Sequence, residues 1–164
     1  MIAMKRLETE SSRRINYNSD IPTLEAYYRE QFELIKKGST DLATLELVML
    51  GNALDFISFA KKSFGIILGP EEKYIMPYDE IADALSRGII TDNIYDNIAK
   101  TAGAYLGFLI IANIGGKWID TESGPALEVR GREVYVADFA ERRLSSGSDL
   151  NAVEYYNAIK ALKN

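Results

Sequence analysis

The residues of this chain best suited to chemistry are carboxylates that gather between positions 71 and 96. Asp79 and Asp83 stand four residues apart, and so do Asp92 and Asp96, a spacing that brings two side chains to one side of a helix. Such pairs can form a solvated acidic surface, dock a basic protein, hold a divalent cation or act as an acid/base pair. The last two interpretations are the weakest, because Mg²⁺ and Ca²⁺ need more oxygen ligands in a defined loop.

The two residue types that most often carry catalysis are missing. The chain contains no histidine and no cysteine. Their absence excludes the Ser-His-Asp, Cys-His and HExxH arrangements, together with disulfides and cysteine-bound zinc. We therefore expect a protein that is not an enzyme and that takes no cofactor and no metal. A carboxylate-based enzyme is the lesser alternative.

The charge balance narrows the range of partners. The 164 residues carry a formal net charge of −5, so the summed field repels phosphate backbones and attracts basic proteins. The glycines do not have the spacing of a phosphate-binding loop, since neither GxGxxG nor GxxxxGK followed by Ser or Thr occurs. We expect a basic protein as partner, and no nucleic acid or nucleotide.

The longest nearly uninterrupted apolar run covers residues 102–114. It is shorter than the roughly 20 residues that a membrane-spanning helix needs, so it predicts a buried core helix. Small residues in this run, Gly103 and Gly107 among them, would let a neighbouring backbone approach closely. Residues 1–14 lack the apolar stretch of a secretory signal. We expect no membrane association and a cytoplasmic protein.

For several aromatic and basic residues of the C-terminal half, a structural role is a better explanation than a binding role. Trp118, the single tryptophan, is expected to anchor the core because its ring buries a large area. Of the neighbours Tyr155 and Tyr156, one ring should face the core and the other should point outward, where it is a candidate for an interface. Arg142 and Arg143 are expected to face solvent or to pair with carboxylates rather than to bind phosphate.

The elements that position these residues follow from the periodicity. Apolar positions recur every three or four residues and predict helices at 23–37, 41–62, 79–86, from 92 or 93 to about 109, 137–144 and 149–163. Gly38 suits a left-handed cap at the end of the first helix, and Ser148 suits the N-cap of the last. After Gly115 and Gly116 the period falls to two, which predicts an antiparallel β-meander at about residues 117–136.

The predicted fold class is therefore α+β. We expect a mainly helical single domain over residues 21–164, with the small meander between N-terminal and C-terminal helices. Residues 1–20 show little periodicity and are expected to form a flexible N-terminal arm.

The C-terminal half carries a pattern of short motifs. These are Gly103-Ala-Tyr-Leu-Gly107, Gly115-Gly-Lys-Trp118, Gly124-Pro-Ala-Leu127 and Arg142-Arg-Leu-Ser-Ser-Gly147. Over residues 92–162 the pattern resembles uncharacterised bacterial domains that combine a GxxLG helix, a Trp-led meander and closing helices, and it weakly resembles toxin-immunity proteins. The resemblance implies a binding role. An acidic residue often follows the second glycine in that pattern, whereas this chain has Phe108.

The function that these features favour is a cytosolic protein-binding module. Its specific form would be an immunity protein that neutralises a basic toxin such as a nuclease, since opposite charge speeds association. The residues expected to bind the partner are Asp79, Glu80, Asp83, Asp92, Asp96 and Tyr155. The alternative is a regulatory or structural interaction domain, which could be a homodimer.

Overall fold

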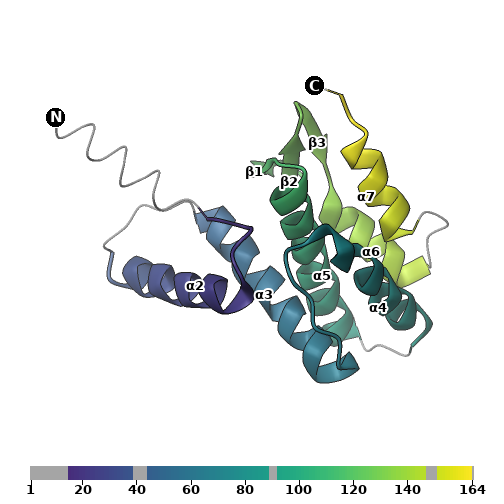
Figure 1. Ribbon diagram of the computed structural model, residues 1–164, viewed down its shortest axis with the longest axis horizontal. Coiled ribbons are helices and arrows are strands. Elements are labelled where there is room, and N and C mark those ends of the chain that lie inside the picture. Colours follow the sequence, from purple (N-terminus) through teal and green to yellow (C-terminus); the bar gives the residue numbers. More distant parts are fainter. Residues whose placement is uncertain (1–14, 39–43, 89–91, 147–150, 164) are drawn as a thin grey trace.

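The computed structural model in Figure 1 describes residues 15–38, 44–88, 92–146 and 151–163. The helices are α2 (Ile21–Lys36), α3 (Thr44–Phe64), α4 (Ile75–Arg87), α5 (Asp92–Asn113), α6 (Val136–Ser146) and α7 (Ala152–Lys160), with the short 3₁₀ helix η1 (Glu72–Tyr74) before α4. The strands are β1 (Lys117–Thr121), β2 (Gly124–Val129) and β3 (Arg132–Val134). The predicted α+β fold, mainly helical with an antiparallel meander between helices, is confirmed.

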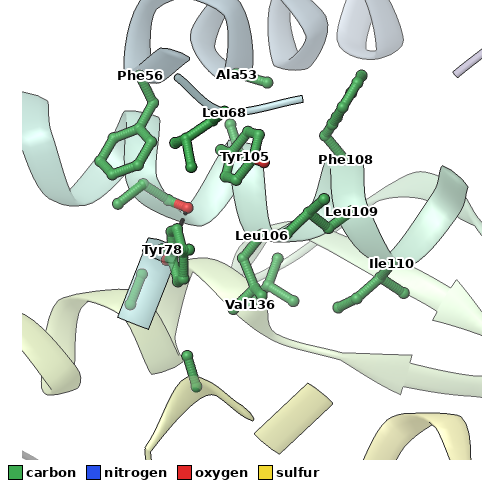
Figure 2. Packing of buried hydrophobic residues seen from close by; sticks show 14 of the residues in the cluster. Ala53, Phe56, Leu68, Tyr78, Tyr105, Leu106, Phe108, Leu109, Ile110 and Val136 are labelled. Carbon is green, nitrogen blue, oxygen red and sulfur yellow. Dashed lines mark hydrogen bonds between the residues drawn. The ribbon is translucent and has the colours of Figure 1, made fainter. Parts of the chain in front are cut away.

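Helix α5 lies at the centre of the molecule, between α3 on one side and α6 on the other (Figure 1). One aromatic ring from each of three helices meets in the core, Phe56 from α3, Tyr78 from α4 and Tyr105 from α5 (Figure 2). Their ring centroids are 5.6 to 5.8 Å apart, within the range of favourable aromatic pairs. The run at 102–114 is therefore part of a core helix, as predicted. No helix in the described ranges has the length and apolar character to cross a bilayer.

The hydroxyls of Tyr105 and Tyr78 bind backbone oxygens in the core. The Tyr105 hydroxyl donates to the carbonyl of Gly69 at 2.6 Å, and the Tyr78 hydroxyl donates to that of Ala102 at 3.0 Å. The amide of Asn113 donates to the carbonyl of Pro70 at 2.8 Å. The segment between α3 and η1 is thereby attached to α5 by side-chain bonds that satisfy its buried carbonyls.

The glycines of α5 allow close packing, by a neighbouring backbone at Gly103, as the sequence predicted, and by a side chain at Gly107. A Cβ on Gly103 would lie 2.8 Å from the Cα of Ala137 in α6, and a Cβ on Gly107 would lie 2.4 Å from the ring of Trp118. Trp118 is partly buried and packs against the core from outside, so it is less buried than the core anchor that the sequence predicted.

Replacing Gly103 with alanine is expected to destabilise the protein by about 2 kcal/mol, because α6 must move away from α5 and overpacking outweighs the gain in helix propensity. Urea unfolding followed by circular dichroism measures the change. The matched control is Gly88→Ala, whose Cβ would meet only ordinary contacts at 3.5 Å or more. Equal stability of the Gly103→Ala variant and the wild type would contradict the close approach of the two helices.

The meander has strand order β1-β2-β3, with Trp118 opposite Leu127 and Leu127 opposite Val134. The meander ends earlier than predicted, because helix α6 already begins at Val136. In the first turn of α6, the backbone amide of Phe139 donates to the carbonyl of Tyr135. The turn between β2 and β3 contains Arg130 with φ of 51°, a conformation rare for a residue with a side chain.

Helix α7 is held at its C-terminal end by side chains from other elements. The Arg130 guanidinium donates to the carbonyls of Lys160 and Leu162, which lack partners within the helix. The Glu72 carboxylate accepts from the Tyr156 hydroxyl at 2.7 Å and from the Lys160 ammonium at 2.8 Å. The bond from Lys160 holds the pKa of the Glu72 carboxyl below its usual range.

The helix ends differ from the predictions where capping side chains were misjudged. Helix α2 begins at Ile21, because Asp20 accepts from the amide of Thr23 at 2.9 Å and acts as the N-cap. The N-cap of α7 is Asn151, not Ser148, and its side chain accepts from the amide of Glu154 at 2.8 Å. Ser148 lies outside the described residues. Gly38 has φ of 69°, which confirms the left-handed cap after α2.

Part of the expected N-terminal arm lies against the domain. Tyr17 is buried, its ring meets Phe108 edge-on at 5.6 Å, and its hydroxyl donates to the Glu46 carboxylate at 3.2 Å. These contacts make Tyr17 part of the packed domain, and residues 1–14 lie outside the described part of the chain.

Candidate binding surface

Helix α2 lies at the edge of the molecule, beside α3 (Figure 1). Tyr28 packs so closely on α3 that a Cβ at Gly51 would come within 2.7 Å of its ring. Ile21, at the start of α2, lines a groove together with Lys61, in the last turn of α3. The two helices therefore run in opposite directions. We call them the α2–α3 pair.

One end of this pair exposes large apolar side chains. Phe32 of α2 and Val48 of α3 are each 45% exposed, and half-buried Leu34 and Ile35 lie on the same end of α2. The Phe32 ring stacks on that of Tyr28 at 6.0 Å. We call Phe32, Leu34, Ile35 and Val48 the apolar end. Phe32 lies at helical spacing from other apolar residues of α2, and only its exposure in the folded chain distinguishes it from them.

A buried amide near the apolar end lacks a partner. Gln31 is 6% exposed, and its Oε1 accepts no hydrogen bond in the described part of the chain. An unsatisfied buried acceptor costs about 1–3 kcal/mol. Within α2 only Leu24 and Gln31 are buried, so the helix contributes little to the core. Its attachment to the domain is therefore weaker than that of the central helices.

A groove of about 610 Å³ lies at the other end of the α2–α3 pair. It is bounded by the first turns of α2, the last turns of α3 and the segment after α3. Leu54, Ile57 and Leu68 give it an apolar floor, and Ile67 at its side is 69% exposed. Sequence reasoning missed this groove, although Leu54 and Ile57 belong to the apolar pattern of α3.

Two of the predicted acidic docking residues, Asp79 and Asp83, have structural partners. One oxygen of Asp79 in α4 accepts from the backbone amide of Ala152 at 2.8 Å and lies 3.4 Å from Nε of Arg143 in α6. Asp83 pairs with Arg143 at 3.4 Å and with the exposed guanidinium of Arg87. The Arg143 side chain is 7% exposed. The carboxylates thus neutralise a buried cation, and the expected pairing of Arg143 with acidic residues is confirmed.

The other predicted residues lie on several elements. Glu80 is exposed on α4 and Asp96 is exposed on α5, whereas the side chain of Asp92 lies outside the described residues. Tyr155 is half-buried and its ring stacks on Phe139 at a centroid distance of 3.9 Å. Burial raises the pKa of Tyr155 to about 12. Tyr155 therefore contributes to the packing of α7 on α6.

No cluster of three or more acidic side chains that could hold a metal ion occurs among the described residues. No family model matches the chain, and no curated protein or solved structure is significantly similar to it.

Proposed function

We propose that this protein is a protein-binding module and that the apolar end of the α2–α3 pair contacts the partner. The observation that carries the proposal is the exposure of Phe32 and Val48 on adjacent helices. Aromatic and aliphatic side chains at the centre of an interface supply much of the binding free energy when a partner removes them from water. The weak attachment of α2 also lets the helix adjust to a partner.

We propose a basic protein as the partner. The net charge of −5 favours its approach. The charges of Asp79 and Asp83 are balanced by arginines, so the attraction comes from the chain as a whole. The narrower proposal is an immunity protein that neutralises a basic toxin such as a nuclease in the cytoplasm. The cytoplasmic location rests on a composition without cysteine.

The test is purification of the tagged protein from its native host, with mass spectrometry of the proteins that copurify at low and moderate salt. The Phe32→Asp variant is expected to weaken binding of the partner at least tenfold, because a charge replaces an apolar anchor. Met76→Asp is the control, since Met76 is 61% exposed on α4, away from the α2–α3 pair. Binding that both variants retain would refute the proposed surface.

The second candidate is a regulatory or structural domain that forms a homodimer. The same apolar end favours it, because one surface can pair with its own copy across a two-fold axis. Light scattering decides between the two. A dimer mass that Phe32→Asp reduces to a monomer supports the homodimer, and a monomer at all concentrations excludes it.

A further inference from the structure

We propose that the groove between α2, α3 and the segment after α3 binds a small single-chain apolar carboxylate, of the size of a medium-chain fatty acid. The site lies at the opposite end of the α2–α3 pair from the apolar end, so the inference does not depend on the proposed protein partner. It rests on three features: the volume, the apolar floor and two lysines that form no ion pair with another described residue.

The volume and lining fit a small apolar molecule. About 610 Å³ falls within the range of small-molecule sites, which is about 300–1,000 Å³. Leu54, Ile57 and Leu68 would contact an apolar chain along the floor, and Ile67 would lose its exposure to water when the groove is filled. Each Å² of apolar surface removed from water contributes about 25 cal/mol.

The charged residues that line the groove favour a ligand with a negatively charged head group. Lys61 and Lys62, in the last turn of α3, both line the groove, and neither forms an ion pair within the described ranges. An ammonium group favours a carboxylate through a charge-assisted hydrogen bond. Glu25, one turn of α2 after Ile21, also lines the groove. Its carboxylate repels the carboxylate of a ligand. The head group is therefore directed toward the lysines.

The overall charge favours a free molecule over a membrane. An anionic bilayer surface repels a chain of net charge −5, whereas two local lysines can still bind one carboxylate inside an apolar groove.

The first experiment is a titration of the full-length protein with sodium decanoate, kept below the concentration at which it forms micelles, followed by amide chemical shifts. We expect saturable shifts at groove residues, weaker binding of decanol, and still weaker binding of decyltrimethylammonium. Shifts that never saturate, that lie outside the groove, or that are equal for all three compounds would overturn the proposal.

Variants separate the head-group contact from the apolar contact. The double variant Lys61→Gln with Lys62→Gln is expected to weaken decanoate binding about three- to tenfold and to leave decanol binding unchanged. The control Lys100→Gln with Lys163→Gln removes two exposed charges elsewhere and should change neither. Ile67→Asp should weaken both compounds and cannot disturb the core, because Ile67 is 69% exposed. Unchanged decanoate binding in the first double variant would refute the role of the lysines.

Discussion

Raising the pH above 10 is expected to unfold this protein cooperatively, before pH reaches about 12 to 13. Burial is the main cause that raises the pKa of Tyr17, Tyr78 and Tyr105 well above the ordinary value of 10.0. The nearby Glu46 carboxylate adds to the effect at Tyr17, and Asp79 adds to it at Tyr78. These hydroxyls keep their protons in the folded state at a pH where the unfolded chain has lost them.

The direction of the pH dependence follows from this difference. A folded-state pKa above the unfolded one leaves stability intact below pH 10 and removes it as the pH rises toward the folded pKa. Each such tyrosine lowers the free energy of unfolding by about 1.4 kcal/mol per pH unit. Three of them lower it by about 4 kcal/mol per pH unit, which exhausts a typical stability of about 5–15 kcal/mol within a few units.

Phenolate absorbance and circular dichroism, recorded together against pH, measure this effect. We expect the exposed tyrosines to ionise first and the buried ones to ionise in step with the loss of helical signal. Tyr105→Phe should reduce the pH slope by about 1.4 kcal/mol per unit. Tyr135→Phe should reduce it less, because that hydroxyl is exposed. Gradual ionisation of all ten tyrosines near pH 10 in a chain that stays folded would contradict their burial.

Replacing Asp79 with alanine is expected to lower the free energy of unfolding by about 3 kcal/mol. One carboxylate oxygen of Asp79 joins three helices, since it belongs to α4, pairs with Arg143 of α6 and accepts from the amide of Ala152 in α7. Among the described residues, its loss leaves the buried guanidinium of Arg143 with Asp83 as its only carboxylate partner and leaves the Ala152 amide without its acceptor. An uncompensated buried charge is among the largest single causes of destabilisation.

Urea unfolding of three variants tests this role. Asp79→Asn should cost less than Asp79→Ala, because an amide oxygen can still accept from Ala152. Glu80→Ala is the matched control, since Glu80 is exposed on the same helix and should change stability by less than about 0.5 kcal/mol. If Asp79→Ala and Glu80→Ala were equally stable, Asp79 would be free to serve as a docking residue, as the sequence suggested.

The apolar end and the groove can be tested separately, because each can be changed by a substitution that leaves the other unchanged. Phe32 and Ile67 are both exposed, so their substitution changes a surface without opening the core. The protein partner is tested at one end of the α2–α3 pair and the small carboxylate at the other.

The α+β class, the order of helices and meander, and the close approach of a neighbouring backbone at Gly103 could all be predicted from the amino-acid sequence. These features depend on local periodicity and on the size of neighbouring side chains, which are properties of short segments. The absence of histidine and cysteine likewise excludes whole classes of chemistry, because no arrangement of the chain can supply a side chain that it lacks.

The roles of individual polar and apolar residues could not be predicted, because they depend on contacts between segments that are far apart in the sequence. Asp79 pairs with Arg143, which lies 64 positions away in the sequence. A carboxylate that the sequence predicted to lie on the surface is therefore part of a buried ion pair. Phe32 follows the same helical pattern as buried Leu24, yet it is exposed because α2 packs mainly against α3 at the edge of the domain. Periodicity marks the apolar side of a helix, whereas the packing of neighbouring helices determines how much of that side is covered.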